Sequence, residues 1–230
     1  MNTAPNKTPS KSARRAFWLA MALLLVLVGW WVVATPRQAP EAPGQTRTAA
    51  LPAGSEVAVF AGGCFWCTEA DFDKVPGVLV TTSGYTGGKT ANPTYTEVSS
   101  HTTGHAEAVQ VIFDPRQVSY RQLVDYFWRT IDPTVKDRQF CDIGSPYRTA
   151  IFATSAEQLQ VAQAARASLE KTKPFAEPIV TQLLMADDFY PAEAEHQNYH
   201  QINPRRYDFY RQGCGRDARL AQLWGESAKP

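Results

Sequence analysis

The sequence predicts an α+β domain with a ferredoxin-like, split βαβ core of sheet and helix layers, an irregular C-terminal extension and a preceding N-terminal membrane helix. Apolar runs of strand length and segments of helical spacing alternate as strand, helix, strand, strand, helix, strand, which is the split βαβ order. Short turns rich in Pro and Gly separate these segments. An uninterrupted apolar run near the N-terminus adds the membrane helix.

The globular part begins near Glu56. Its strand segments are apolar, alternating or rich in β-formers, and they are residues 57–61, 78–83, 105–113, 148–153 and 179–185. Its helical segments are residues 65–75, 119–131 and 155–173. Ser155 and Gln158 start the last of these as a capping box. Residues 119–131 carry apolar side chains at helical spacing, so one face of this helix should pack on the sheet.

The first 55 residues differ from the rest in composition. Residues 1–16 carry four basic residues and are predicted as a cytoplasmic basic tail, followed by a transmembrane signal anchor at residues 17–34. Cleavage after Val32-Val33-Ala34 is the alternative to an uncleaved anchor. Residues 35–55 form a Pro/Ala-rich linker. The predicted location is therefore the inner or cytoplasmic membrane, single-pass, with residues 56–230 on the periplasmic or extracytoplasmic side.

Charge and cysteine content narrow the function classes. The chain has 23 Lys and Arg against 22 Asp and Glu and no basic stripe, which argues against nucleic-acid binding. Four cysteines, Cys64, Cys67, Cys141 and Cys214, would face an oxidising compartment. They allow three disulfide pairings, and the sequence alone does not choose among them.

The segment Gly-Gly-Cys-Phe-Trp-Cys places Cys64 between an apolar strand and the first turn of a helix. The glycines permit a sharp turn, and the free N–H groups and dipole of the helix start favour a thiolate on Cys64. Phe65 and Trp66 add apolar surface beside it. A structural Cys-x-x-Cys disulfide is the competing interpretation.

Other polar residues lie at sequence positions that would suit catalysis. Position alone does not establish a catalytic role for them. Glu107 lies within an apolar strand pattern, where burial would raise its pKa, although an exposed strand start is the commoner situation. Tyr95 alone would be an anchoring aromatic residue, while Asp142 and Tyr147 fall in an irregular segment before a strand.

His196 and His200 have the i, i+4 spacing of helical metal ligands, and His101 and His105 repeat it. Gln197 stands where the zinc-protease signature requires Glu. Surface or capping histidines are therefore expected, and no metal is predicted.

Taken together, these segments resemble the peptide-methionine (S)-S-oxide reductases of the A type, the MsrA family. The resemblance covers residues 57–224, and its motifs occur in the family's order. They are Gly63-Cys64-Phe65-Trp66, Gly84-Tyr85-Thr86-Gly87-Gly88, Asn92-Pro93-Thr94-Tyr95, Thr103-Gly104-His105-Ala106-Glu107, Phe127-Trp128, Asp132-Pro133-Thr134, Gln139, Asp142, Gly144 and Tyr147-Arg148.

The resemblance implies reduction of methionine-S-sulfoxide, in proteins and in free form, and repair of oxidised proteins. Cys64 would attack the sulfur and become a sulfenic acid, while Glu107, assisted by Tyr95 and Tyr147, would protonate the oxygen. In this scheme, Phe65 and Trp66 would form the substrate pocket with Asp142 orienting the substrate. Residues 56–230 would then be the catalytic domain, expected as a monomer.

A second thiol must then form a disulfide with Cys64, and a thioredoxin-like dithiol, rather than a bound cofactor, would reduce it. The chain lacks the cysteine that many relatives carry soon after the Asn-Pro pair at Asn203. Cys214, between two glycines, is slightly favoured as the resolving residue. Cys67 is the competitor or a relay, and Cys141 could join such a relay or be a buried bystander.

Two other functions fit parts of the sequence. A membrane-anchored Cys-x-x-Cys thiol-disulfide oxidoreductase would explain Cys64, Cys67 and the export signal, but it leaves Tyr95 and Glu107 without a role. A non-enzymatic domain held by two disulfides would contain no reactive thiolate.

Overall fold

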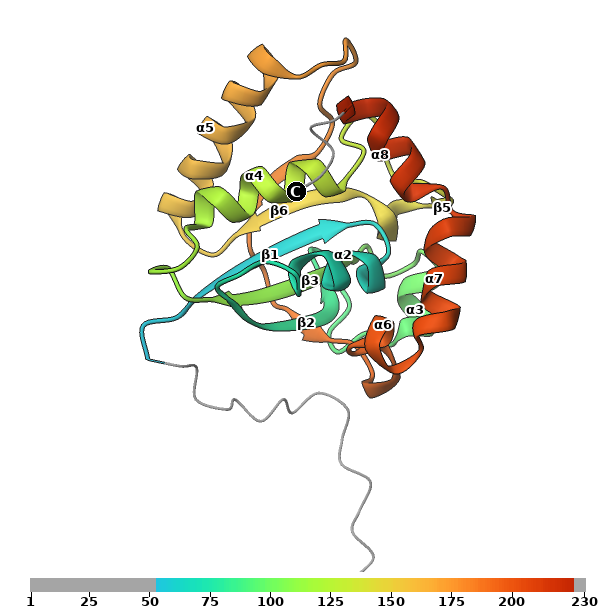
Figure 1. The fold of residues 1–230 in the computed structure, drawn as a ribbon. Helices are drawn as coiled ribbons and strands as arrows, with labels where there is room; N and C mark the ends of the chain where they lie inside the picture. Colours follow the sequence, from blue (N-terminus) through green and yellow to red (C-terminus); the bar gives the residue numbers. More distant parts are fainter. Residues whose placement is uncertain (1–52, 226–230) are drawn as a thin grey trace, which may run out of the picture. The chain divides into compact units, whose positions relative to one another are not determined.

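The computed structural model describes residues 53–225 (Figure 1). Its centre is a six-stranded sheet in the order β7-β6-β1-β3-β2-β8. The strands are β1 (Glu56–Gly62), β2 (Val78–Thr86), β3 (Ala106–Phe113), β6 (Thr149–Ala153), β7 (Gln182–Met185) and β8 (Tyr190–Pro191). Strand β1 pairs antiparallel with β3 and β6, whereas β6 and β7 are parallel, so the sheet is mixed.

The helices are α2 (Phe65–Phe72), α3 (Tyr95–Ser99), α4 (Tyr120–Thr130), α5 (Ala156–Thr172), α6 (Tyr199–Ile202), α7 (Pro204–Gly213) and α8 (Arg216–Trp224). Two 3-10 turns, η1 (Ser145–Tyr147) and η2 (Ala194–His196), and a small hairpin of β4 (Arg138–Gln139) and β5 (Asp142–Ile143) complete the described chain.

The α+β prediction is confirmed. The predicted succession of strand, helix, strand, strand, helix, strand corresponds to β1, α2, β2, β3, α4 and β6. The first helix is shorter than expected, because it ends at Phe72 rather than at residue 75.

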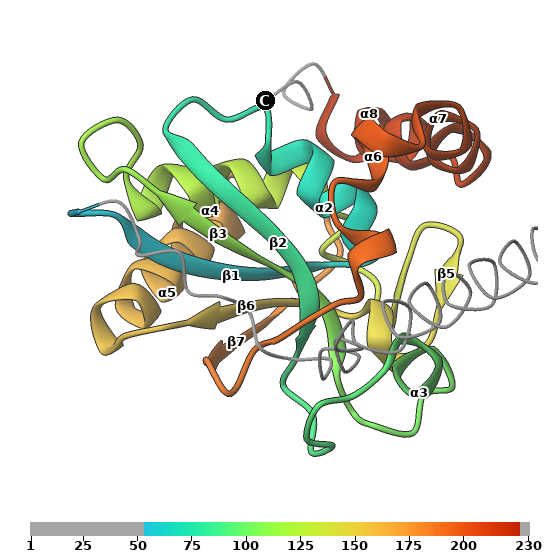
Figure 2. The same ribbon diagram turned by 90° about the horizontal axis from the view of Figure 1, so that it is seen from below.

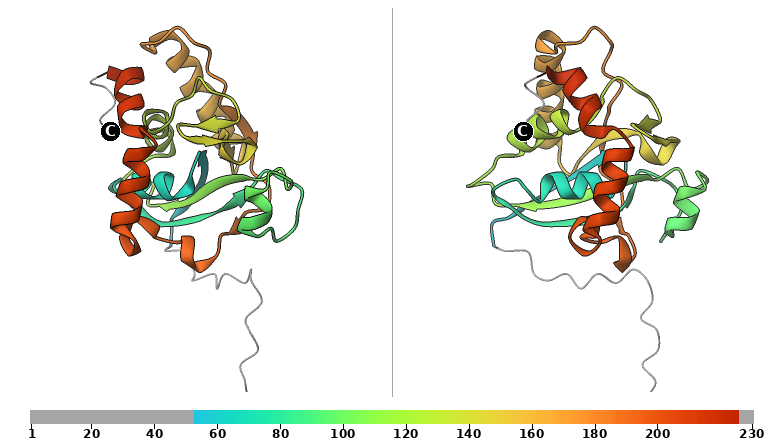
Figure 3. Two further views of the ribbon diagram at one scale, coloured as in Figure 1. Left: turned by 90° about the vertical axis from the view of Figure 1, so that its right-hand side faces the viewer. Right: turned by 45° about the vertical axis from the view of Figure 1, so that its right-hand side comes forward.

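The C-terminal extension is helical, so the expectation of an irregular segment is wrong. Helices α7 and α8 follow one another there (Figure 3). Helix α7 buries only Tyr207, so its sequence shows no amphipathic pattern from which a helix could be predicted. Pro204 at its start, where no N–H is needed, is the local signal that was available.

Strand β1 sends alternate side chains into two buried clusters, as the period of a strand requires. Phe60 faces helices α2 and α4, with ring centroids 4.7 Å from Phe72 and 5.0 Å from Phe127. Val59 and Ala61 join a second cluster with Phe152 on the opposite face. Burying one such Phe side chain contributes about 2–3 kcal/mol.

Helices α2, α4 and α5 cover the same face of the sheet (Figure 2), because their side chains share one cluster with Phe60. Helix α4 begins with a capping box in which Ser119 and Gln122 satisfy each other's backbone N–H groups. Phe60 and Phe65, on either side of the β1–α2 junction, both pack into this cluster.

No helix within residues 53–225 has both the length and the apolar character needed to cross a bilayer. The predicted basic tail, anchor and almost all of the linker lie outside the described residues. These assignments stay predictions.

Candidate active site

The β1–α2 junction turns sharply because two glycines stand at it. Gly63 has φ +85°, and a Cβ there would lie 2.5 Å from the Gln139 side chain. A Cβ on Gly62 would lie 2.7 Å from Thr68 Oγ1. The turn leaves Cys64 at the N-cap of α2, 6% exposed, with no side-chain hydrogen bond to the helix start. The predicted placement of Cys64 is confirmed.

Glu107 of β3 lies against the same helix start. The Phe65 backbone N–H, which the helix leaves free, donates to Glu107 Oε2 over 3.0 Å. Glu107 is 2% exposed, and burial raises its pKa to about 8, although the Phe65 hydrogen bond opposes the shift. The carboxyl therefore holds a proton at neutral pH, and the exposed-strand alternative is wrong.

Cys64 and Cys67 are both free, buried and within hydrogen-bonding reach of each other. Burial, Cys67 and the nearby acids raise the pKa of Cys64 well above its ordinary value. The hydrogen bond from Cys64 lowers the pKa of Cys67 to about 7 despite burial, with help from Arg216 and Arg211. Burial therefore opposes the resting thiolate that the helix start led us to expect on Cys64, and this expectation stays a prediction.

Aromatic side chains surround this pair. Phe65 is 1% exposed and packs in the hydrophobic core, with its ring centroid 6.4 Å from that of Tyr95. Trp66 is half-buried and stacks on Tyr199 with centroids 3.7 Å apart. Its Nε1–H donates to His196 Nδ1 over 3.2 Å. The structure thus fixes the indole of Trp66 from two sides.

His196 corrects the prediction of surface or capping histidines. It is 8% exposed, and its ring centroid lies 4.3 Å from that of Tyr95. His200 instead lies 3.4 Å from Asp73, so the two histidines do not converge on a common ligand. His105 is also buried, accepting from the Gly88 N–H and bonded to the Thr90 carbonyl.

Glu193 was not found from the sequence. Its Oε1 accepts from the Tyr95 N–H over 2.7 Å and its Oε2 from the Tyr85 hydroxyl over 2.8 Å. These bonds attach the start of α3 to β2 and orient Tyr95 toward the site. Hydrogen bonds lower the pKa of Glu193 although burial opposes this, so it is an anion. No spacing or motif distinguished it from its neighbour Glu195.

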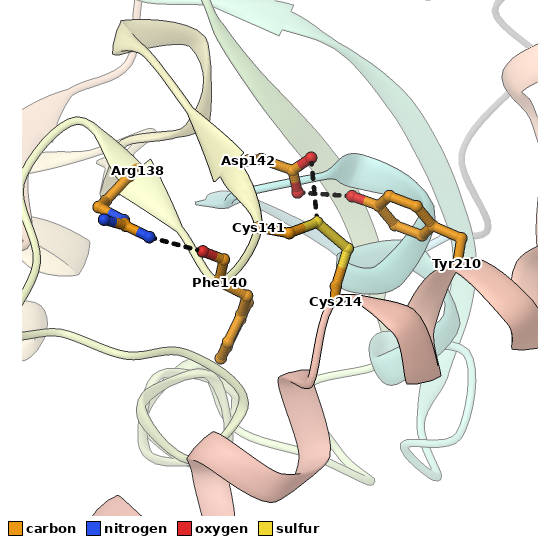
Figure 4. Close-up of a disulfide and its surroundings, with 6 residues drawn as sticks. All are labelled: Arg138, Phe140, Cys141, Asp142, Tyr210 and Cys214. Carbon is orange, nitrogen blue, oxygen red and sulfur yellow. Dashed lines mark hydrogen bonds between the residues drawn. A yellow bond between two sulfur atoms is a disulfide. The ribbon is translucent and has the colours of Figure 1, made fainter.

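Asp142 of β5 and Tyr147 of η1 both lie close enough to Cys64 to interact with it electrostatically. Tyr210 of α7, also missed by sequence reasoning, donates from its hydroxyl to Asp142 Oδ2 over 2.5 Å (Figure 4). The Tyr210 hydroxyl is also within hydrogen-bonding reach of Cys64. Burial raises the pKa of Tyr147, and Glu107 and Tyr95 raise it further. The predicted acid and tyrosines are therefore brought together around Cys64.

Cys141 and Cys214 form a disulfide with Cα atoms 4.8 Å apart, a pairing the sequence left open (Figure 4). Cys141 is exposed, so it is not a buried bystander. Cys214 closes α7, and Gly215, at φ +65°, begins α8. Within residues 53–225, Cys141, Asp142 and Cys214 are also the one close set of potential metal donors, but the two sulfurs are bonded to each other.

Comparisons with known proteins agree with this arrangement. A family model described as "Peptide methionine sulfoxide reductase" matches residues 56–228. The peptide methionine sulfoxide reductase MsrA of Bacillus licheniformis is 51% identical over 170 residues, covering 74% of this chain and 94% of the relative. MsrA 2 of Rhizobium meliloti is 52% identical over 176 residues, covering 75% and 85%.

Solved structures show the same fold. The reduced form of Mxr1 from Saccharomyces cerevisiae matches with a TM-score of 0.63 at 30% identity, covering 67% of this chain and 88% of that one. Methionine sulfoxide reductase A of Corynebacterium diphtheriae matches with a TM-score of 0.60 at 35% identity, covering 66% and 77%.

Proposed function

Since the chain belongs to the peptide methionine sulfoxide reductase family, as an enzyme of the MsrA type, we propose that Cys64 is its nucleophile and Glu107 its proton donor. The single observation that carries this assignment is the contact of both residues with one helix start. Cys64 caps α2, and Glu107 accepts from the N–H of the next residue, Phe65. The Cys64 thiol and the protonated Glu107 carboxyl thereby lie at the same helix start.

The reaction needs both groups because the oxygen of a sulfoxide is a poor leaving group until it is protonated. Glu107, whose pKa is raised to about 8, gives its proton to this oxygen. Cys64 attacks the sulfur as its own thiol proton passes to Cys67. The protonated oxygen then passes from the substrate sulfur to the Cys64 sulfur, while its bond to the substrate sulfur and the new S–S bond break. Methionine leaves, and Cys64 becomes a sulfenic acid.

The surrounding side chains bind and orient the methionine-S-sulfoxide. Trp66, held by Tyr199 and His196, offers an apolar face to the substrate's methyl group. Tyr95 and Tyr147 assist protonation, because burial raises the pKa of each and both hydroxyls keep their protons at neutral pH. Asp142, bonded to Tyr210, orients the substrate from the opposite side. The substrate is free methionine sulfoxide or an oxidised protein.

Cys67 is the thiol that we propose to resolve the sulfenic acid. It is free, lies one helical turn from Cys64 and is within hydrogen-bonding reach of it, whereas Cys214 is bonded to Cys141. The reaction of the two residues releases water and forms a Cys64–Cys67 disulfide. The sequence-based preference for Cys214 stays a competing prediction.

A thioredoxin-like dithiol then reduces this disulfide by thiol–disulfide exchange. We also propose that residues 17–34 anchor the enzyme in the cytoplasmic membrane with its catalytic domain outside. Oxidised envelope proteins would then be its substrates. Protease accessibility of the domain in intact spheroplasts tests the orientation, and protection of the domain from the protease would contradict it.

Single-turnover mass spectrometry tests the thiol chemistry. Fully reduced enzyme mixed with one equivalent of a methionine-S-sulfoxide peptide should yield one methionine and one Cys64–Cys67 disulfide. Cys67→Ser should leave a sulfenic acid on Cys64 that a dimedone reagent traps, while Cys214→Ser should form the first disulfide normally. A block in Cys214→Ser alone would instead favour Cys214 as the resolving residue. Disulfide exchange without consumption of sulfoxide would favour the thiol-disulfide oxidoreductase alternative.

A further inference from the structure

We propose that the Cys141–Cys214 disulfide controls the substrate pocket through Tyr210. The disulfide holds the β4–β5 hairpin against the corner between α7 and α8, and this keeps Asp142 bonded to Tyr210. Opening the disulfide by reduction weakens binding of the sulfoxide, so the enzyme binds its substrate best under oxidising conditions. This inference rests on the proposed function, because it assigns Tyr210 and the disulfide as positioning elements for Asp142, which orients the substrate.

Tyr210 connects two parts of the site that come from different elements. Its hydroxyl donates to Asp142 Oδ2 on β5 over 2.5 Å (Figure 4). Its ring lies edge-on to that of Trp66 on α2, with centroids 5.7 Å apart. Tyr210 therefore stands between the aromatic side chain and the acid that we assign to substrate binding.

Helix α7, which carries Tyr210, is attached to α2. Arg211 Nη1 lies 2.9 Å from Asp71 Oδ1. Tyr207 packs in one buried cluster with Cys67. These contacts bring Tyr210 to α2, and they do not involve the β4–β5 hairpin. The position of the hairpin relative to Tyr210 therefore depends on other contacts.

The β4–β5 hairpin has a turn that its own sequence does not favour. Gln139 pairs with Asp142, so Phe140 and Cys141 form a two-residue turn. The commonest two-residue turns require positive φ angles and favour Asn, Asp or Gly. Phe140 has φ +52°, a left-handed conformation that is costly for a residue with a bulky side chain. The turn therefore needs support from the surrounding structure.

Both residues of this turn are held by the corner between α7 and α8. Cys141 is bonded to Cys214, the C-cap of α7. The guanidinium of Arg216, the first residue of α8, lies 4.5 Å from the ring centroid of Phe140. The disulfide is the covalent one of these two attachments, so we expect it to dominate the position of the hairpin.

The disulfide and the Tyr210–Asp142 hydrogen bond link the same two elements. Asp142 directly follows Cys141 in the chain. Tyr210 lies one helical turn before Cys214, whose N–H donates to the Tyr210 carbonyl over 2.9 Å. Each link restricts the motion that the other must restrict, so the hydrogen bond is easier to form while the disulfide is closed. Loss of the disulfide should therefore weaken the hold of Tyr210 on Asp142.

A thioredoxin-like dithiol, the class of reductant that we assign to the catalytic cycle, opens this disulfide by exchange. Cys141 is exposed, so one thiolate of the dithiol attacks its Sγ. The S–S bond breaks, and Cys214 leaves as a thiolate that takes up a proton. The second thiol of the dithiol attacks the mixed disulfide and releases Cys141 as a thiol. Two electrons and two protons pass to the enzyme, and the dithiol becomes a disulfide.

Peptide binding to Cys64→Ser tests the proposal on the full chain, because this variant cannot turn over and tolerates a reductant. Isothermal titration calorimetry with a methionine-S-sulfoxide peptide compares the oxidised protein with protein whose disulfide a phosphine has opened. Mass spectrometry verifies the state of Cys141 and Cys214. We expect reduction to raise Kd about tenfold. In the same background, Cys141→Ser/Cys214→Ser should bind as weakly as the reduced protein and should not respond to the phosphine.

A double-variant cycle separates this role from a general effect on stability. Tyr210→Phe removes the hydroxyl that bonds to Asp142 but keeps the ring beside Trp66. It should raise Kd about tenfold by itself, and reduction should then raise it by less than about twofold more. Tyr126→Phe is the matched control, because it removes a hydroxyl that bonds to the Asp71 carbonyl. The control should bind like the parent protein and respond fully to reduction.

An unchanged Kd after reduction would overturn the proposal. Full effects of both Tyr210→Phe and reduction in the combined experiment would overturn it as well, because the disulfide would then act by another route. If Cys64→Ser does not fold, initial methionine release by wild-type protein and by Cys141→Ser/Cys214→Ser decides. The double variant should need about tenfold more peptide for half-maximal rate, with a smaller change in the maximal rate. Failure of wild-type protein to release one methionine would instead refute the proposed function.

Discussion

Glu107 is the proposed proton donor, and its environment suits that role. Burial keeps its carboxyl protonated, while the Phe65 N–H fixes its orientation. Replacing it by Gln preserves size and the hydrogen bond from Phe65 but removes the acidic proton. We expect kcat to fall by about 10² to 10⁴ in Glu107→Gln. Steady-state assays with a dithiol reductant measure this, and a loss confined to KM would contradict the assignment.

The same carboxyl determines the pH dependence of the first chemical step. Glu107 must be protonated to act, and its pKa is about 8, so the single-turnover rate of methionine release should fall as pH rises through about 8. Rapid-quench rates between pH 6 and 9.5 test this. The decline should be absent from the residual activity of Glu107→Gln, and a decline of equal size in that variant would show that another group is responsible.

Burial of Glu107 also costs stability. Its pKa is raised from an ordinary 4.5 to about 8, so the folded state binds the proton more tightly than the unfolded state. The stabilisation is fully present below about pH 4.5 and is lost as pH rises toward 8. Glu107→Gln should therefore increase the free energy of unfolding at pH 7 by up to about 3 kcal/mol, with little gain at pH 4.5. Urea titrations at both pH values test this difference.

At the scale of elements, the turn between β1 and α2 positions the nucleophile. Gly63 combines φ +85° with contact to Gln139, whose side chain bonds to Asp132 in both directions. We expect Gly63→Ala to lower the free energy of unfolding by about 2–4 kcal/mol and to reduce activity, because Cys64 must move with the turn.

Gly54→Ala is the matched control for this turn. Gly54 has a similar φ of +81°, but a Cβ there meets nothing within 4 Å. The control isolates backbone strain, which costs about 1 kcal/mol, from the collision with Gln139. Urea unfolding and initial rates of both variants decide the matter, and equal losses in the two would show that the close approach to Gln139 is unimportant.

For the whole molecule, the Cys141–Cys214 disulfide closes a loop over a sequence separation of 73 residues. It should stabilise the domain by about 2–4 kcal/mol, chiefly by restricting the unfolded chain. The double variant Cys141→Ser/Cys214→Ser should lose this amount in urea unfolding at pH 7. Wild-type protein with all thiols reduced is the control, and equal stability of the oxidised and reduced wild-type proteins would exclude a structural contribution.

The elements that could be predicted are those with local signals. The order of strands and helices from β1 to α5 follows from apolar periodicity and turn residues, and Cys64 was placed correctly at a helix start because two glycines precede it. Glu107 was selected because an acid within an apolar strand is unusual. Helix α7 was missed because it buries only Tyr207 and has no apolar stripe, whereas α8 buries Leu220, Leu223 and Trp224 at helical spacing, a local signal that could have predicted it.

The sequence by itself determined the family resemblance and singled out the proposed nucleophile, Cys64, and the proposed acid, Glu107, because each belongs to a contiguous motif. Tertiary structure alone decided which cysteines pair and which residues support them. Glu193, Tyr210 and Arg216 reach the site only because the chain returns after β7 to pass beside α2. Their effect on the thiols depends on burial and on distances of a few ångströms, and neither is encoded in any local spacing.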